Sequence, residues 1–286
     1  MSTSNGKFRL SLGKCLLCFV FFGCVVAVSQ LHAADPPAAQ EDFDAYKIKF
    51  TGFWFYTQPT GTFTGTGGKG FFDFQKDVSF NSYSTVTAGV DWKFTRKNHL
   101  TFEVTPFDRT KSFVAVRNIS FQGQTFIVGT SISANLKANG YAPGYMYDII
   151  RRKRGHLAIK AQFNIFDVLG SLDAGAQVVN GTPVLAHRAQ GTIRAPIPVF
   201  GPDVRFYLTK NSNRLFVTGN ILGMYFFGYG NFISTFDTVG LSATKHLKIR
   251  AGYQLGSRLN VNNNAATRIG ISLTQKGPVV GIEVPF

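Results

Sequence analysis

Four histidines are the side chains beyond residue 33 that are best suited to proton transfer or metal binding: His99, His156, His187 and His246. Three of them share one context, because His99, His156 and His246 each precede a leucine that opens an alternating segment. A metal site or a Ser–His pair needs side chains that converge on one point. A repeated context instead places the three in equivalent, separate positions. We therefore expect no catalytic residue, no metal site and no cofactor.

Basic side chains gather on one face of the alternating segments. From Leu247 to Gly256 the odd positions are apolar, whereas the even positions include Lys248 and Arg250. If the polar face lines an interior, that interior is basic and should favour small anions. The bases that this alternation places there are Lys47, Lys49, Lys93, Arg109, Lys160, Arg188, Arg194, Lys248, Arg250 and Arg258, and the acids are Asp91, Glu103, Glu283 and Asp148.

The elements that must position these residues are strands. Segments of about ten residues with one apolar and one polar face are typical of transmembrane β-barrels. Four short basic turns lead into them, at 97–100, 154–157, 212–215 and 244–247. The other connections are longer, at about 58–82, 112–130, 168–187 and 259–267, apart from a tight one near 228–230. Short turns at one end and long loops at the other indicate an up-and-down barrel with its turns in the periplasm.

The pattern predicts an all-β, antiparallel barrel of ten strands, with eight or twelve still open. The number of strands is harder to count where Pro196, Pro198 and Pro202 interrupt one segment, because proline fits a strand only at edges or bulges. The expected strands are 45–57, 83–95, 99–111, 131–151, 155–167, 187–208, 214–227, 231–244, 247–258 and 268–286.

The N-terminal region has the layout of a secretion signal. A basic start precedes a 14-residue apolar run, 15–28, which is shorter than a membrane-spanning helix needs. We expect a signal peptide at 1–33, a short periplasmic segment at 34–44 and the barrel at 45–286. A lipoprotein with Cys24 modified is the alternative. All three cysteines lie in this region, so the mature chain can form no disulfide.

The C-terminus ends on an alternating apolar strand, with Val280, Ile282 and Val284 followed by the terminal Phe286. This resembles the assembly signal of bacterial outer-membrane proteins. The mature chain as a whole resembles the small-barrel class typified by the OmpA and OmpW transmembrane domains, by pattern rather than by matched motifs. The resemblance implies the outer membrane, periplasmic chaperoning, insertion by the barrel-assembly machinery, and both termini in the periplasm.

The residues that open the strands after the short turns form an expected periplasmic rim: His99, His156, Arg214 and His246. Without its signal peptide the chain has a net charge of +12. In the envelope, phospholipid phosphates and lipopolysaccharide are more plausible partners for this charge than nucleic acid, which we do not expect. The rim is therefore a candidate contact for lipid phosphate.

The expected function is non-enzymatic: a structural barrel, or a narrow anion-preferring channel with a basic lumen. Ten strands lie close to the size at which side chains fill the interior, which favours a polar interior that stabilises the barrel over one that conducts. Two alternatives remain. A lipid-modifying enzyme would need a Ser–His or Asp–His pair at a membrane face, and an adhesin or receptor would act through the longer loops.

Overall fold

A computed structural model describes residues 43–64, 71–78, 82–209, 212–226, 230–262 and 270–286. The expected signal peptide, 1–33, and residues 34–42 of the expected periplasmic segment lie outside the described residues. The described part includes no helix long and apolar enough to cross a membrane.

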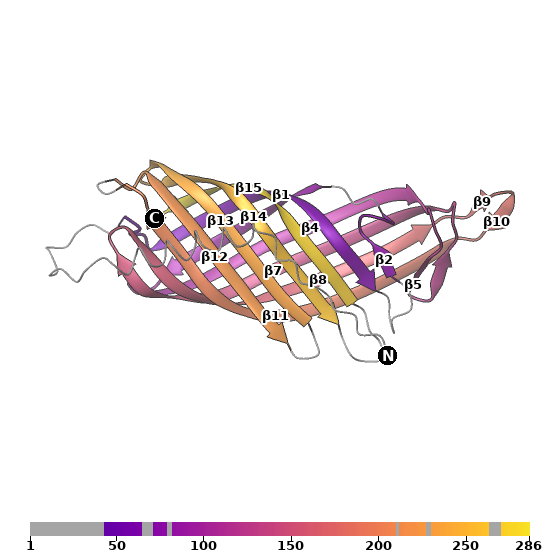
Figure 1. Ribbon diagram of the computed structural model, residues 1–286, viewed down its shortest axis with the longest axis horizontal. Coiled ribbons are helices and arrows are strands. Elements are labelled where there is room, and N and C mark those ends of the chain that lie inside the picture. The colour runs from indigo at the N-terminus through magenta and orange to yellow at the C-terminus, as the bar shows by residue number, and fades with distance from the viewer. Residues whose placement is uncertain (1–42, 65–70, 79–81, 210–211, 227–229, 263–269) are drawn as a thin grey trace, which may run out of the picture. The chain divides into compact units, whose positions relative to one another are not determined.

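Ten antiparallel strands close into a barrel (Figure 1), which confirms the predicted fold class and strand number. Each barrel strand pairs with its neighbour in the chain, and β15 pairs with β1 from Lys49↔Pro285 to Thr64↔Gly270 to close the ring. The strands are β1 (Ile48–Thr64), β3 (Tyr83–Lys93), β4 (Asn98–Val114), β7 (Ser131–Arg152), β8 (Gly155–Ala174), β11 (His187–Tyr207), β12 (Leu215–Phe226), β13 (Gly230–Thr244), β14 (Leu247–Asn262) and β15 (Gly270–Pro285).

The two ends of the barrel differ, as the sequence predicted. At one end, the turn end, short turns join β3 to β4, β7 to β8, β11 to β12 and β13 to β14. The β7–β8 turn requires a glycine, because Gly155 has a φ of +142° and a Cβ there would lie 2.0 Å from the carbonyl oxygen of Arg205. Phe286 also lies at this end, where its amide donates to the carbonyl of Ile48.

The opposite end, the loop end, carries five further short strands. β2 (Phe71–Asp73) pairs with the last residues of β1. β5 (Ile119–Phe121) pairs with β6 (Gln124–Phe126), and β9 (Gln177–Val179) pairs with β10 (Thr182–Val184). The β9–β10 hairpin projects at the end away from the C-terminus (Figure 1). The long loops predicted between the strands are thus partly built into small sheets.

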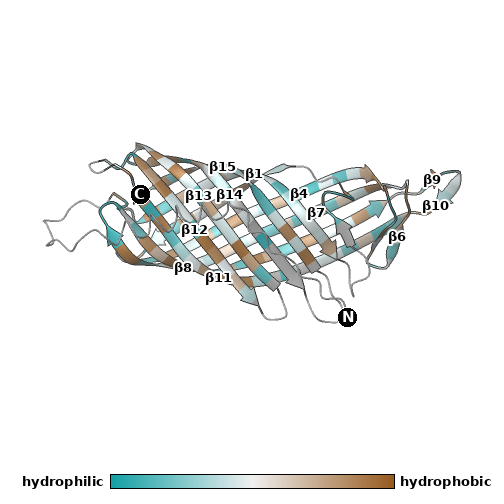
Figure 2. Cartoon of the chain, viewed as in Figure 1, coloured by the Kyte–Doolittle hydropathy of each residue, from teal (hydrophilic) through white to brown (hydrophobic). Residues whose placement is uncertain are grey.

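Large apolar side chains cover the outside of the barrel in its turn half. Hydrophilic and hydrophobic positions alternate along the strands (Figure 2), because successive side chains point to opposite faces. On β8 the outer positions Ile159 and Phe163 are 40% and 56% exposed, whereas Lys160 and Gln162 between them are buried. An exposed apolar belt around a closed barrel is the surface that a bilayer covers.

The polarity of the two faces is reversed in the loop half. Tyr141, Ile165 and Pro196 are cross-strand neighbours on the outer face of β7, β8 and β11. The next outer row towards the loops is Asn139, Asp167 and Arg194, which is polar. The inner face changes in the opposite sense and becomes an apolar core, which includes Phe63, Phe74, Ile119, Phe121, Phe126, Ile132, Leu136, Val168, Leu172, Ala189, Ile197, Val199 and Ile271. The loop half is therefore built like a water-soluble β-protein.

Two of the three prolines of β11 fit this arrangement. The pairing of β11 with β8 runs its whole length, but its pairing with β12 begins only at Phe200. Pro196 and Pro198 thus lie where β11 is an edge strand on one side, the position in which proline is tolerated. They interrupt the pattern in the sequence without interrupting the strand.

Candidate functional site: the charged lumen and its N-terminal plug

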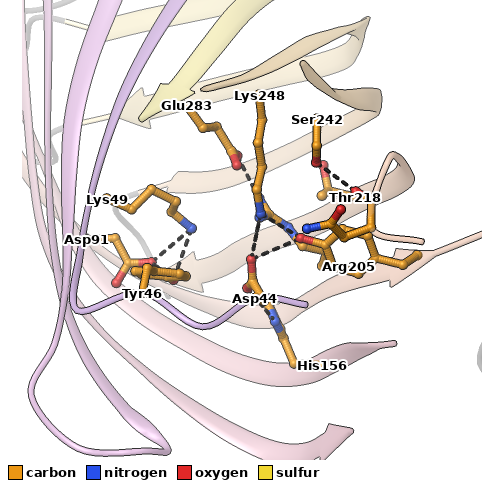
Figure 3. A network of polar contacts seen from close by, with 12 residues as sticks. Asp44, Tyr46, Lys49, Asp91, His156, Arg205, Thr218, Ser242, Lys248 and Glu283 are labelled. Carbon is orange, nitrogen blue, oxygen red and sulfur yellow. Dashed lines mark hydrogen bonds and ion pairs between the residues drawn. The ribbon is translucent and has the colours of Figure 1, made fainter. Parts of the chain in front are cut away.

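The turn half of the barrel encloses a network of charged side chains, and residues 43–46, which precede β1, lie inside it (Figure 3). We call these four residues the plug. Asp44 and Tyr46 are 2% and 8% exposed, although Ala45 between them is exposed. The side chain of Phe43 packs edge-on against the ring of Tyr207, 5.6 Å away between centroids. The plug therefore fills the lumen at the turn end.

Asp44 is the centre of the network. Its Oδ1 atom accepts from Arg205 at 2.9 Å and from Lys248 at 3.1 Å, and Oδ2 lies 3.4 Å from Nδ1 of His156. Burial by itself raises the pKa of the Asp44 carboxyl, but Arg205 and Lys248 outweigh it and hold that pKa well below its ordinary value. The backbone carbonyl of Asp44 also accepts from Lys93 and Arg151, each at 3.1 Å.

Tyr46 ties the plug to β1 and β3. Its hydroxyl donates to Oδ2 of Asp91 at 2.5 Å and accepts from Nζ of Lys49 at 3.0 Å. The ammonium group of Lys93 lies 3.8 Å from the centroid of the Tyr46 ring, a cation–π contact. Burial and the nearby carboxylate of Asp91 raise the pKa of the Tyr46 hydroxyl well above its ordinary value, so it stays neutral and keeps donating.

Two histidines each lie between two carboxylates. His99, fully buried, faces Asp91 at 2.9 Å through Nδ1 and Asp148 at 3.3 Å through Nε2. His156 faces Asp44 through Nδ1 and Asp203 at 3.3 Å through Nε2. Each imidazole thus bridges different parts of the wall, and His156 also bridges the wall to the plug.

Further ion pairs line the interior. Glu283, fully buried, accepts from Arg205 at 2.6 Å and from Arg250 at 2.5 Å. Lys160 pairs with Glu103 at 2.7 Å. A buried ion pair contributes to stability only when its hydrogen bonds are well satisfied, and this lumen supplies several partners for most charges.

The lumen is close to charge balance, which the sequence did not indicate. Among the described residues, seven bases and six carboxylates lie inside the turn half, together with His99 and His156. The bases are Lys49, Lys93, Arg151, Lys160, Arg205, Lys248 and Arg250, and the carboxylates are Asp44, Asp91, Glu103, Asp148, Asp203 and Glu283. Sequence reasoning missed Asp44, Arg151, Asp203 and Arg205 as lumen residues. Asp203 and Arg205 alternate with Tyr207 on β11, a signal that the neighbouring prolines obscured.

Three arginines predicted to line the lumen lie on the outer face instead. Arg188 and Arg194 pair with Asp173 and Asp167, and their side chains are 68% and 73% exposed. They belong to the loop half, where the outer face is polar. Arg258 is exposed and lies opposite the outward-facing Ile233, because the register shift between Gln254 and Ser257 exchanges the two faces of β14.

Two further predicted lumen bases are exposed at opposite ends of the barrel. Arg109 is near the loop end and donates to the carbonyl of Ser84 beside the shorter β3. Lys47 precedes β1 at the turn end, where its amide donates to the carbonyl of Phe286. The predicted surplus of lumen bases, on which an anion preference rested, is therefore reduced to a single base among the described residues.

The predicted periplasmic rim divides into two groups. Arg214 and His246 are exposed at the turn end, and His246 stacks on the ring of Phe286. His99 and His156 are buried inside the barrel and do not belong to the rim. Their position has a simple reason: a residue that directly precedes an outward-facing leucine in a strand must itself face inward.

A cavity of about 290 Å³ lies between the charged network and the apolar core. Lys160 and Gln162 line it together with the rings of Phe53, Phe166 and Phe236. A smaller cavity of about 90 Å³, lined largely by apolar side chains, shares Phe166 with it and lies towards the loops. The described residues contain no group of three or more His, Cys, Asp or Glu side chains suited to a metal ion.

Comparisons with solved structures identify outer-membrane barrels. The outer membrane protease OmpT from Escherichia coli has a TM-score of 0.53 at 10% identity, over 84% of this chain and 96% of that one. The Pseudomonas putida toluene transporter TodX gives 0.37 at 9% identity, over 85% and 91%. Ail, the attachment invasion locus protein of Yersinia pestis, gives 0.32 at 8% identity, over 82% and 99%. Neither protein-family models nor curated proteins give a match. At these identities the likeness to OmpT shows the fold alone.

Proposed function

We propose that this chain is a non-enzymatic barrel of the bacterial outer membrane, closed to ions, that serves as a structural scaffold. In this proposal the turn end and both termini face the periplasm, and the polar-surfaced loop half stands outside the membrane. The exposed apolar belt of the turn half supports the membrane location, and the reversed polarity of the loop half supports the projection into water.

The observation that carries a closed barrel is that both halves of the interior are filled. The plug and its ion pairs occupy the turn end, with Asp44 and Glu283 almost or fully buried. The apolar core occupies the loop half, with Phe63, Phe74 and Phe121 fully buried. An ion would have to leave its hydration shell to cross that core, at a large cost in free energy.

The environments of the histidines favour a non-enzymatic role. His99 and His156 are enclosed by carboxylates, His187 contacts the ring of Phe126, and His246 contacts the carbonyl of Pro285. Among the hydrogen bonds of the described residues, none of the four bonds to a serine. The Ser–His pair of a lipid-modifying enzyme is thus not assembled there. The Asp–His pairs of His99 and His156 are buried inside the barrel and do not lie at a membrane face.

The terminal residue fits a role in assembly. The backbone of Phe286 bonds to Ile48 and Lys47, so the last residue completes the seam between β15 and β1, while its ring stays 62% exposed beside Phe50. In the proposal this exposed ring is what the barrel-assembly machinery recognises.

Planar-bilayer recording of the refolded protein tests the closed scaffold. Slower migration of unboiled than boiled protein on a gel first establishes that the barrel has folded. We expect no steady conductance above the lipid background. Stable channel openings would refute the closed barrel, and a reversal potential in a salt gradient that indicates anion selectivity would support the narrow anion channel instead.

A further inference from the structure

Six basic side chains are exposed around the turn end, and we call them the collar. They come from every short turn and from the seam between the termini: Lys47, Arg96, Lys97, Arg152, Arg214 and Lys245. Two further arginines beside the β7–β8 turn are engaged elsewhere. Arg151 pairs with Asp148, and Arg154 donates to the carbonyls of Tyr207 and Leu208.

Acids and bases are separated radially at this end. Among the described residues Asp44, Asp91, Asp148 and Glu283 are all buried inside the barrel, and the turn end exposes no acid. Asp108, Asp167 and Asp173, whose side chains are exposed to solvent, lie in the loop half of β4 and β8. Among the described residues, the exposed charges of the turn end are thus all positive, although the inside is nearly neutral.

Exposed aromatic rings lie directly beside the collar. Trp92 and Phe94 are 45% and 44% exposed just before the turn that carries Arg96 and Lys97. The ammonium group of Lys97 lies 5.9 Å from the centroid of the Tyr147 ring. Aromatic rings of a barrel lie at the level of the lipid headgroups, so cations one step further from the belt lie at the level of the phosphates.

From this placement we infer that the collar is a binding surface for the phosphate groups of phospholipids in the adjacent leaflet. The inference rests on the proposed membrane location. The ligand is a headgroup layer rather than a single anion, because the six cations are spread over separate turns and do not converge. Anionic lipid attracts them more than zwitterionic lipid does, and salt screens the attraction.

The test is the thermal unfolding midpoint of the protein in bilayers of phosphatidylcholine with increasing phosphatidylglycerol. We expect the midpoint to rise with the anionic fraction. The rise should shrink as salt goes from about 0.1 M to about 1 M, where the Debye length falls from about 10 Å to about 3 Å. Equal midpoints in zwitterionic and anionic bilayers, for a protein that has inserted, would overturn the inference. The collar side chains would then only keep the turns in water.

Two triple variants distinguish lipid binding by the collar from attraction that depends only on the net charge of the protein. Replacing Arg96, Lys97 and Lys245 with Ser removes three of the six collar cations and should remove about half of the gain. Replacing Lys111, Lys137 and Lys276 with Ser removes the same charge from exposed positions in the loop half and should leave the gain intact. An equal loss in both variants would overturn the inference in favour of general electrostatic attraction.

A last experiment distinguishes binding of lipid headgroups from binding of free phosphate. Inorganic phosphate added to the protein in phosphatidylcholine bilayers should not raise the midpoint beyond the effect of sodium chloride at equal ionic strength. A specific rise would indicate a discrete anion site and overturn the headgroup assignment. Failure of the protein to insert into any bilayer would instead refute the proposed membrane location, so the two failures are distinguishable.

Discussion

Replacing Asp44 with Asn should release the plug while leaving the barrel intact. The substitution keeps the shape of the side chain but removes the charge that Arg205, Lys248 and His156 share. Removing one partner of a buried ion pair costs about 3–5 kcal/mol. Arg205 keeps Glu283 at 2.6 Å, so most of this cost should favour local opening rather than global unfolding.

The magnitude follows from that cost. Since about 1.4 kcal/mol is tenfold in an equilibrium, about 3 kcal/mol should raise the open population of the plug by roughly a hundredfold. Chymotrypsin can cleave after Tyr46 only when this buried ring leaves the lumen, and in the limit of fast closing the cleavage rate follows the open population. The measurement is this rate by mass spectrometry, with the intact barrel checked by its gel shift.

Asp167→Asn is the matched control, because the same chemical change falls on the exposed partner of Arg194, where a pair contributes about 0–1 kcal/mol. Cleavage of Asp44→Asn at the wild-type rate would refute the central role of Asp44 in the network.

The pH dependence has a defined sign. The pKa of Asp44 is lowered in the folded protein, so its contribution is fully present above the ordinary carboxyl pKa of about 3.9. The contribution is lost only as the pH falls through the lower, folded value. With pepsin as the acid protease, the wild-type plug should stay protected at about pH 4 and open at more acidic pH. Release of the wild-type plug already at about pH 5 would contradict this.

Three further predictions concern the wall. Asp237 lies on the outer face of β13 next to the exposed Val239, so Asp237→Val should stabilise the protein in lipid by about 1 kcal/mol in urea unfolding. Asp108→Val, outside the belt, should not raise the stability. Lower stability of the Asp237→Val variant would argue against a lipid-facing belt. A Cβ at Gly281 would lie 2.1 Å from Cδ1 of Phe53, so Gly281→Ala should destabilise the folded barrel by about 1–3 kcal/mol. Gly256→Ala should not, because a Cβ there meets open space. Equal urea midpoints for the two variants would refute this packing. Phe286→Ala should lower the amount of barrel in the outer membrane severalfold in cell fractionation, and Phe163→Ala, which removes another exposed belt ring, should not; normal levels of the Phe286 variant would exclude its ring as the assembly signal.

The sequence by itself determined the barrel. Alternation with a period of two predicted the strands, and short turns at one end with longer loops at the other favoured a barrel over other β folds. Four of the connections could be located from the basic turns, so a count of ten strands could be predicted. Alternation also identified Lys49, Lys160 and Arg250 as side chains of the same face, because within an unbroken strand parity is fixed by geometry.

Only the tertiary structure decided which face of each strand meets water. Arg194 lies on the outer face and meets water because β11 continues beyond the apolar belt. The point on β11 at which the belt ends depends on the neighbouring strands. Arg258 lies outside because a bulge in β14 shifts the parity, and no residue type in the sequence marks it. Asp44 belongs to no strand, and it is buried because the chain folds back into the lumen, where Arg205 and Lys248 from distant strands converge on it. Parity is a local property, whereas the neutralisation of charge inside the barrel depends on contacts between residues far apart in the chain.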